Sequence, residues 1–356
     1  MAPPPQHEEV RVVGRSWRSL FVLSIVAGAA PVATACDPAG ITDAPESPSA
    51  ARVAYVGQEG GRPALFVQNA DGTGRTRIHF VGARELPGNP DVVPPVEDAH
   101  VLALAGLAWS PDGRQLAVVV TLAYDQSEVV VVNADGTNAR VASLNTQIIM
   151  TTPDWSPDGT RLAYGMSTIA GAGGVQLFVT DLAAGTWRQV TKGVPIGSAG
   201  TDARWSTDGG TIYLWRTLGA PGPDSDWLAR ISSVDAATGA VRVLADSVAG
   251  MVQEVGRGGT WALVIRQAAA AGGQPWVRDL VRRPLVGLGP EVRLAQGNLM
   301  WARASWDDRS VTVVSDQDPA QGGNSYTAWL LPIGGGKAAP LEGLDRSAFV
   351  LDVSFE

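Results

Sequence analysis

A short motif recurs along the chain at intervals of about 50 residues. The string WSPDG stands at 109–113 and again at 155–159, and Trp109 serves as its marker. The positions that continue the rhythm are Trp155, Trp205, Val255, Trp306 and Phe355. The successive spacings are 46, 50, 50, 51 and 49 residues. Because a period of this length is typical of stacked structural units, the repeat limits the fold to a solenoid, a propeller or a related array.

Each copy of the motif lies in the same local pattern. An apolar segment ends at the marker, a Pro-Asp-Gly-type turn follows, and a second apolar segment such as QLAVVV at 115–120 comes next. Proline fixes one φ of the turn and glycine accepts a positive φ. A third apolar segment leads into a second turn, NADGT at 69–73 and at 133–137, and a more polar fourth segment ends the unit. Four antiparallel strands per unit are the structure of a propeller blade.

The two ends of the repeat region each supply part of one unit. The segment RVAYVGQ at 52–58 matches the second strand of the other units, and FVLDVSFE at 349–356 matches a first strand with no second strand after it. We therefore predict an all-β fold, a six-bladed β-propeller of four-stranded antiparallel blades in which the C-terminal strand completes the first blade. Such closure leaves no free sheet edge. The first strands are expected near 105–109, 151–155, 201–205, 251–255, 302–306 and 351–355.

These motifs resemble those of TolB-like, WD-repeat-like six-bladed β-propellers over roughly 51–356. The WSPDG and NADG strings carry the resemblance, most specifically in the units that begin near 105 and 151. TolB itself has an N-terminal α/β domain, for which residues 37–50 leave no room, so its role in envelope assembly is not expected to carry over intact. Residues 81–104 are rich in proline and are expected to form an inserted loop on one rim.

The first 36 residues have the charge, apolar core and small-residue end of a secretory signal. Three arginines within 11–18 precede LFVLSIVAGAAPVATAC. The string VATAC resembles a bacterial lipobox, which implies cleavage before Cys36 and a lipid on its sulfur; the alternative is an ordinary signal peptide with an incidental cysteine. Residues 37–50 predict a flexible tether. We expect an exported lipoprotein, anchored to a membrane that faces the periplasm or the cell exterior, with residues 51–356 as its propeller.

Composition argues against several functional classes. The formal net charge is −8 and no basic block is present, so nucleic acid is not an expected partner. No G-x-S-x-G, H-E-x-x-H or phosphate-loop pattern occurs, and the mature chain would hold two histidines, His79 and His100. Two acidic pairs in loops could ligate Ca²⁺ or be solvated loop charges, and no other cofactor is expected. These weak metal candidates are Asp224 with Asp226, and Asp316 with Asp318.

Charged residues are predicted to line the central channel. The first strand of each blade lines the axis and side chains alternate between faces, so residues one and three before the marker face the channel. The candidates at these positions are Asp154, Asp202, Arg204, Glu254, Arg303 and Asp352. They could bind a polar ligand, a peptide segment or a cation, or they could form a mutually neutralising set of ion pairs that closes the channel.

The sequence thus favours recognition over catalysis. We expect a monomeric scaffold that binds a protein or glycan of the cell envelope through long loops at 81–104, 217–226 and 315–325. The alternative function is a polysaccharide-acting enzyme, a lyase or a glycoside hydrolase, that works in the channel. That alternative requires a histidine or two suitably spaced carboxylates facing an open pocket. A third possibility is an envelope spacer without a discrete ligand.

Overall fold

The computed structural model describes most of the region predicted to be the propeller. The described residues are 51–80, 101–123, 126–143, 148–149, 151–167, 175–192, 202–218, 227–268, 277–287, 289–316, 326–344 and 351–355. The predicted signal peptide, Cys36, the tether and most of the insertion therefore lie outside them, as do His100, Asp224, Asp226 and Asp318. These ranges contain strands and turns, and no helix in them is long and apolar enough to cross a membrane.

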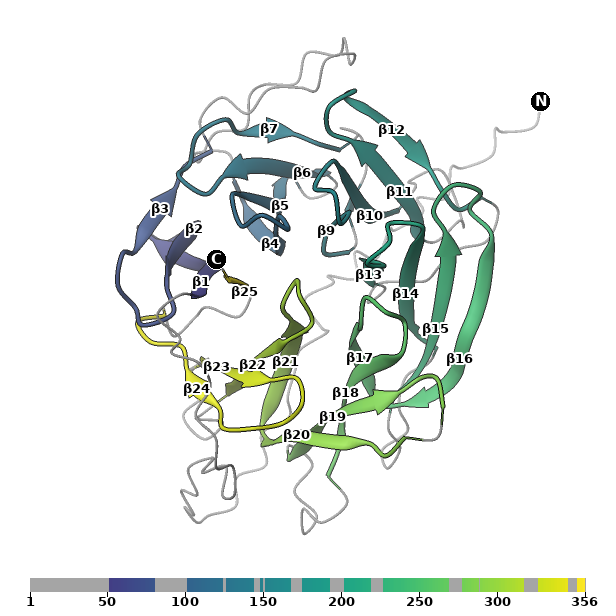
Figure 1. Cartoon of the computed structure of the whole chain (residues 1–356). Coiled ribbons are helices and arrows are strands. Elements are labelled where there is room, and N and C mark those ends of the chain that lie inside the picture. Colours follow the sequence, from purple (N-terminus) through teal and green to yellow (C-terminus); the bar gives the residue numbers. More distant parts are fainter. Residues whose placement is uncertain are drawn as a thin grey trace, which may run out of the picture. The chain divides into compact units, whose positions relative to one another are not determined.

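The strands form six antiparallel sheets, which confirms the predicted fold class. The inner strands β4, β9, β13, β17, β21 and β25 surround one centre (Figure 1). We number the blades along the chain, beginning with the blade that holds β1. The first blade comprises β25 (Leu351–Phe355), β1 (Ala51–Glu59), β2 (Arg62–Asn69) and β3 (Thr76–Ile78). The second comprises β4 (Ala103–Trp109), β5 (Gln115–Ala123), β6 (Gln126–Asn133) and β7 (Arg140–Val141).

The third blade has a divided inner strand. It comprises β8 (Ile148–Ile149), β9 (Asp154–Trp155), β10 (Arg161–Ser167), β11 (Val175–Asp181) and β12 (Thr186–Gln189). Both β8 and β9 pair with β10, and Pro153 stands between them. Because proline has no backbone N–H to donate, the ladder is interrupted there. The side chain of Thr151 takes its place and accepts a 2.6 Å hydrogen bond from the Gly165 amide.

The remaining three blades have four strands each. The fourth comprises β13 (Asp202–Trp205), β14 (Thr211–Thr217), β15 (Leu228–Asp235) and β16 (Val241–Ala249). The fifth comprises β17 (Met251–Val255), β18 (Trp261–Gln267), β19 (Arg278–Pro284) and β20 (Val292–Gly297). The sixth comprises β21 (Leu299–Ala304), β22 (Ser310–Asp316), β23 (Tyr326–Pro332) and β24 (Ala339–Pro340).

The C-terminal strand closes the ring as predicted. Strand β25 pairs antiparallel with β1 in a register that runs from Ala51 opposite Phe355 to Tyr55 opposite Leu351. Tyr55 and Phe66 of this blade share an apolar cluster with Val314 of the sixth blade. The first and last blades are therefore joined by packing as well as by backbone hydrogen bonds.

The core consists of apolar layers between neighbouring blades. Tryptophan at the marker position fills three of these layers, and Trp109, Trp155 and Trp205 are all buried. The indole N–H groups of Trp109 and Trp155 donate to backbone oxygens of the preceding blade, Asp352 O and Ala108 O, at 3.1 Å each. The marker tryptophans thus pack between neighbouring blades.

The register of the last two inner strands differs from the sequence prediction by two residues. Ser305 Oγ donates to Asp307 at 2.6 Å, as Ser110 Oγ does to Asp112. Asp308 has a positive φ of 58°, where the other turns have glycine, and Asp tolerates this conformation. The marker of the sixth blade is therefore Ala304, and Trp306 occupies the position of the turn proline.

The same correction applies to the C-terminal strand. Val353 lies opposite Val53, as Trp109 lies opposite Leu116, so the marker is Val353 and not Phe355. The prediction failed because it required an aromatic marker, while the fold requires only an apolar side chain at this point. Since side chains alternate with a period of two, the error moved residues by one layer along the axis without reversing their direction.

Candidate functional site

Charged side chains of alternating sign surround the axis at one level. In the corrected register, the residue immediately before the marker is charged in five of the six blades, and Ala108 of the second blade instead belongs to the apolar cluster shared with the third. From the second blade onward these residues are Ala108, Asp154, Arg204, Glu254, Arg303 and Asp352. Five of the six predicted channel residues thus belong to one level. Asp202, the sixth, lies two residues earlier in β13, and its carboxylate accepts a 3.0 Å hydrogen bond from the Thr152 amide.

The arginines of this level hold the acids and cross the axis. Arg204 lies 3.5 Å from Glu254, and Arg303 lies 3.9 Å from Glu254 and 3.7 Å from Asp352. Arg204 also donates to Ser305 O in the sixth blade, and Arg303 donates to Leu107 O in the second. Ion pairs of this kind are what the second alternative drawn from the sequence expects, while the first alternative, binding at the axis, is left open by them.

The acids also bind the next blade through its backbone. Asp352 accepts a 2.8 Å hydrogen bond from the Trp109 amide, and Asp154 accepts one of 2.7 Å from the Trp205 amide. An inner strand has no neighbouring strand on its axial side, so the amides on that side need other acceptors. The carboxylates therefore join adjacent blades as well as pairing with arginine.

A further arginine, Arg257, was missed by the sequence analysis. It comes from the turn after β17 and makes a bidentate pair with Asp154 of the third blade, at 2.9 and 3.1 Å. It also donates to Trp205 O and Trp306 O, and its guanidinium lies 3.4 Å from the centre of the Trp306 ring. The sequence did carry a signal, because the turn of the fifth blade reads GRGG, whereas the corresponding turns of the second, third, fourth and sixth blades have proline, threonine or tryptophan followed by aspartate.

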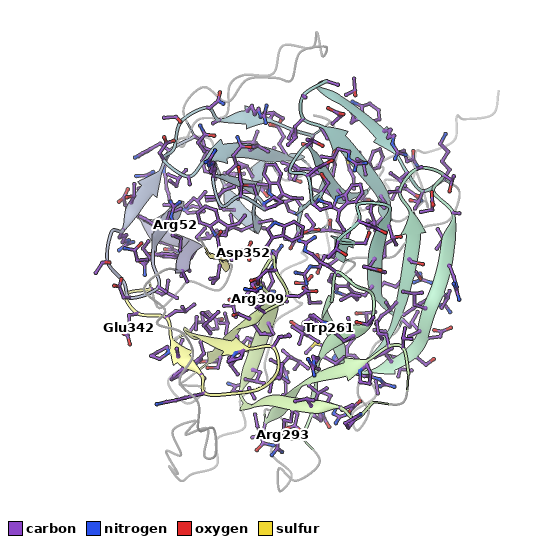
Figure 2. The ribbon with its side chains drawn as sticks, in the orientation of Figure 1. Arg52, Trp261, Arg293, Arg309, Glu342 and Asp352 are labelled. Carbon is purple, nitrogen blue, oxygen red and sulfur yellow. The ribbon has the colours of Figure 1, made fainter. Side chains whose placement is uncertain are left out.

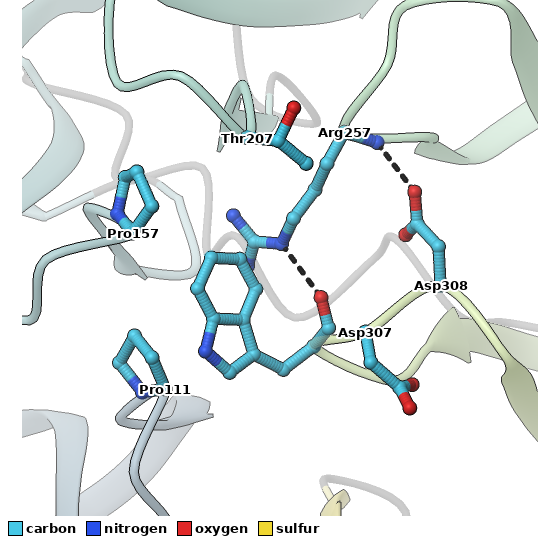
Figure 3. A pocket seen from close by; sticks show the side chains of 7 residues that line it. Pro111, Pro157, Thr207, Arg257, Asp307 and Asp308 are labelled. Carbon is cyan, nitrogen blue, oxygen red and sulfur yellow. Dashed lines mark hydrogen bonds between the residues drawn. The ribbon is translucent and has the colours of Figure 1, made fainter.

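A pocket of about 350 Å³ opens where the turns after the inner strands converge. Turns of five blades line it, with Pro111, Pro157, Thr207, Arg257, Trp306, Asp307 and Asp308. In Figure 3 the two prolines lie on one side and the two aspartates on the other, with Arg257 between them. Figure 2 shows Arg309, from the turn of the sixth blade, and Asp352 near the centre of the ring, far inside Glu342 and Arg293.

Residues 46–251 match a family model described as the TolB beta propeller domain. The chain belongs to this TolB propeller family. Its fold is similar to that of TolB from Acinetobacter baumannii, with 15% identity and a TM-score of 0.62 over 86% of this chain and 67% of that one. It is also similar to the tricorn protease, with 13% identity and a TM-score of 0.47 over 89% of this chain and 36% of that one. At such identities the likeness shows the fold alone, and no curated protein matches the sequence.

Burial changes the acidity of the axial charges of this TolB-family propeller. Burial raises the pKa of Glu254 to about 7, against the opposing effect of Arg204 and Arg303. Burial likewise raises the pKa of Asp352 and that of Asp202. For Arg257 burial lowers the pKa to about 10, although Asp154 acts in the opposite sense. Glu254 is therefore expected to change charge near neutral pH.

The other candidates of the TolB-family chain lie away from this pocket. His79 is exposed and follows β3, the outermost strand of its blade. Asp316 is half-buried at the end of β22. In the described part of the chain, no group of three or more His, Cys, Asp or Glu side chains is placed to hold a metal ion. The geometry that an enzyme would need, a histidine or free carboxylate pair in an open pocket, is met neither by His79 nor by the ion-paired axial acids.

Proposed function

We propose that this propeller is a membrane-anchored recognition module that binds a protein partner, outside the cytoplasm, through its axial pocket. The observation that carries the proposal is the pocket itself, which collects turns from five blades at one end of the axis. Behind it the axis is filled by arginines that are already ion-paired. A site of this kind suits binding, because its buried charges serve the fold and its exposed surface comes from many independent loops.

The described chain begins at the same end of the ring as the pocket, which supports a partner located near the membrane anchor. Arg52, the second residue of β1, donates to Gly113 O in the turn that also carries Pro111. The chain therefore joins the propeller at the pocket end of the axis. A tether over 37–50 could span at most about 50 Å when fully extended. We infer that the partner is a protein located close to the membrane that holds the propeller.

The anchor itself remains a prediction from the leader, and a single substitution tests it. Cys36→Ala removes the sulfur that would carry the lipid. We expect the wild-type protein to label with radioactive palmitate and to partition into detergent, and we expect the variant to do neither while still being exported. Equal membrane association of both proteins would contradict lipid anchoring.

Site-specific photocrosslinking tests the recognition function. A photoreactive amino acid replaces Thr207, which is exposed and lines the pocket, or Arg242, which is exposed on the outer strand β16. In membranes of the source cells, we expect the Thr207 position to give one discrete adduct that the Arg242 position does not give. Mass spectrometry then identifies the partner. Identical adduct patterns from both positions, or none from Thr207, would contradict binding at the pocket.

A further inference from the structure

The geometry points to a basic side chain as the group that the axial pocket receives, an arginine or lysine presented by the partner protein. This inference rests on the proposed function and names the chemistry of its ligand. The volume of about 350 Å³ is at the small end of the range for ligand sites. A pocket of this size suits one side chain and its immediate backbone rather than a length of polymer.

The walls of the pocket suit a long side chain with a cationic end. Pro111 and Pro157 provide apolar surface for a methylene stem, and Trp306 provides an aromatic ring. That ring already holds one guanidinium, since Arg257 lies 3.4 Å from its centre. The internal contact shows that this ring makes a cation–π contact in the folded protein, which is the kind of contact that a basic ligand would use at its remaining exposed surface.

The charged group most accessible to a ligand in this pocket is an aspartate. Asp307 is exposed, and Arg309, which comes within 3.6 Å of it, is itself 85% exposed and can be displaced by a ligand. The one cation that lines the pocket, Arg257, is committed to Asp154. An anionic ligand would therefore meet the carboxylate of Asp307, held only by the exposed Arg309, and that of Asp308, which Arg204 pairs at 3.0 Å. It would find no uncommitted cation among the described lining residues.

Aspartates of the neighbouring turns add to this negative field. A hydrogen bond from Ser206 is the main reason that the pKa of Asp208 is lowered. Although partial burial opposes it, hydrogen bonds from Ser156 and Thr160 bring the pKa of Asp158 down to about 2. These groups stay ionised at neutral pH and favour the approach of a basic partner.

The chain's own N-terminal segment does not have this chemistry. Residues 37–50 contain three acidic residues and neither lysine nor arginine. The tether would therefore be repelled by the carboxylates at the pocket rather than attracted to them. The occupant that fits is an external segment that carries positive charge.

Binding of short peptides to the full-length protein in detergent tests the inference. The probes are a blocked Gly-Arg-Gly peptide and the same peptide with citrulline, which keeps the shape of arginine and removes its charge. By ligand-observed NMR we expect the arginine peptide to bind with a Kd of about 1 mM and the citrulline peptide to bind about tenfold more weakly, since the cationic contacts are worth roughly that factor. Equal binding of both peptides would overturn the inference.

Two pairs of variants distinguish direct contacts in the pocket from the long-range electrostatic effect of the aspartates in the turns. Asp307 and Asp208 hold the same turn position, each accepting from a serine hydroxyl, but only Asp307 lines the pocket. We expect Asp307→Asn to weaken the arginine peptide several-fold and Asp208→Asn to have less than about a twofold effect. Thr207→Lys should abolish binding, while Val241→Lys, which adds the same charge on an exposed outer strand, should not. Equal losses within either pair would contradict a defined pocket.

The outcome also distinguishes this inference from the function on which it rests. A specific adduct from Thr207 without arginine-dependent peptide binding would leave the recognition function intact and reject the basic ligand. Preferential binding of a neutral oligosaccharide over the arginine peptide would likewise reject it. Absence of both the adduct and peptide binding would reject the two proposals together.

Discussion

The inner-strand marker position is filled in two different ways in the two halves of the ring. The second, third and fourth blades carry Trp109, Trp155 and Trp205 there. The fifth, sixth and first blades carry Val255, Ala304 and Val353. All six side chains are buried, so both halves satisfy the same requirement with side chains of very different volume.

The half without marker tryptophans fills the interblade space from other positions. In the fifth blade Trp261 of β18 packs against Gly256, where a Cβ atom would lie 2.3 Å from the indole. Arg257 and Trp306, from the same half, stack on each other beside the pocket. The fold therefore specifies that the space must be filled but not which residue fills it. The pocket lies between the halves, with prolines from the tryptophan half facing Trp306 and the aspartates from the other.

The largest expected effect separates the two halves directly. Trp155→Ala removes a fully buried indole and its hydrogen bond, and we expect it to lower the free energy of unfolding by about 3–5 kcal/mol. Val255→Ala removes two methyl groups at the same position and should cost about 2 kcal/mol. Urea unfolding of both variants measures the difference. Equal losses would show that the marker side chain contributes equally to the unfolding free energy in both halves.

Arg257 should be nearly as important to the half without marker tryptophans. Arg257→Met leaves the buried carboxylate of Asp154 without its guanidinium, and we expect a loss of about 3–5 kcal/mol. Adding Asp154→Asn to this variant removes the unpaired charge and should restore part of the stability. If the double variant is no more stable than Arg257→Met, the cost comes from lost packing on Trp306 and not from the charge.

The raised pKa of Glu254 predicts that stability falls as pH rises toward neutrality. Between the unfolded value of 4.5 and the folded value of about 7, the unfolded chain loses the proton while the folded protein keeps it. The resulting loss in the free energy of unfolding grows to at most about 3 kcal/mol near pH 7 and stays constant at higher pH. Chemical denaturation at pH 5, 6, 7 and 8 should show a smaller decline for Glu254→Gln than for the wild type. Parallel curves would argue that Glu254 is ionised throughout this range.

The smallest effect is expected on the outer surface. Arg230 and Asp246 form an exposed ion pair at 2.7 Å on β15 and β16. Because both groups are solvated, Arg230→Ala should change the unfolding free energy far less than Arg257→Met does. The same urea measurements provide the comparison. A loss as large as that of Arg257→Met would mean that outer and axial ion pairs contribute alike, contrary to the argument from burial.

The fold could be predicted from the sequence because its signals are local and repeated. A turn such as WSPDG contains its own dihedral preferences, and alternation of apolar residues defines each strand. Closure could be predicted from the complementary fragments at the two ends of the repeat. The register of the last two inner strands could not be predicted. Trp306 resembles a marker because it is a tryptophan at the expected spacing, although it lies in the turn that follows the strand. Only pairing of β21 and β25 with their neighbours distinguishes these positions.

The candidate site was predicted in part, because strand alternation is also a local signal. The alternation of strand side chains placed Asp154, Arg204 and Glu254 toward the axis, and the structure brings these three together with Arg303 and Asp352. Arg257 was missed because its partner, Asp154, is 103 residues away along the chain and two blades distant. No local pattern encodes a contact between a turn and an inner strand that lies two blades away.

The sequence by itself determined the number of blades, the order of strands and the closure of the ring, because each follows from short-range turn chemistry and periodicity. The tertiary structure decided which charges are paired, which residue fills each interblade space and where a pocket opens. Those properties depend on side chains that converge at the axis from different blades. Their burial, and with it the pKa of Glu254 and the pairing of Arg257, exists only once the ring has closed.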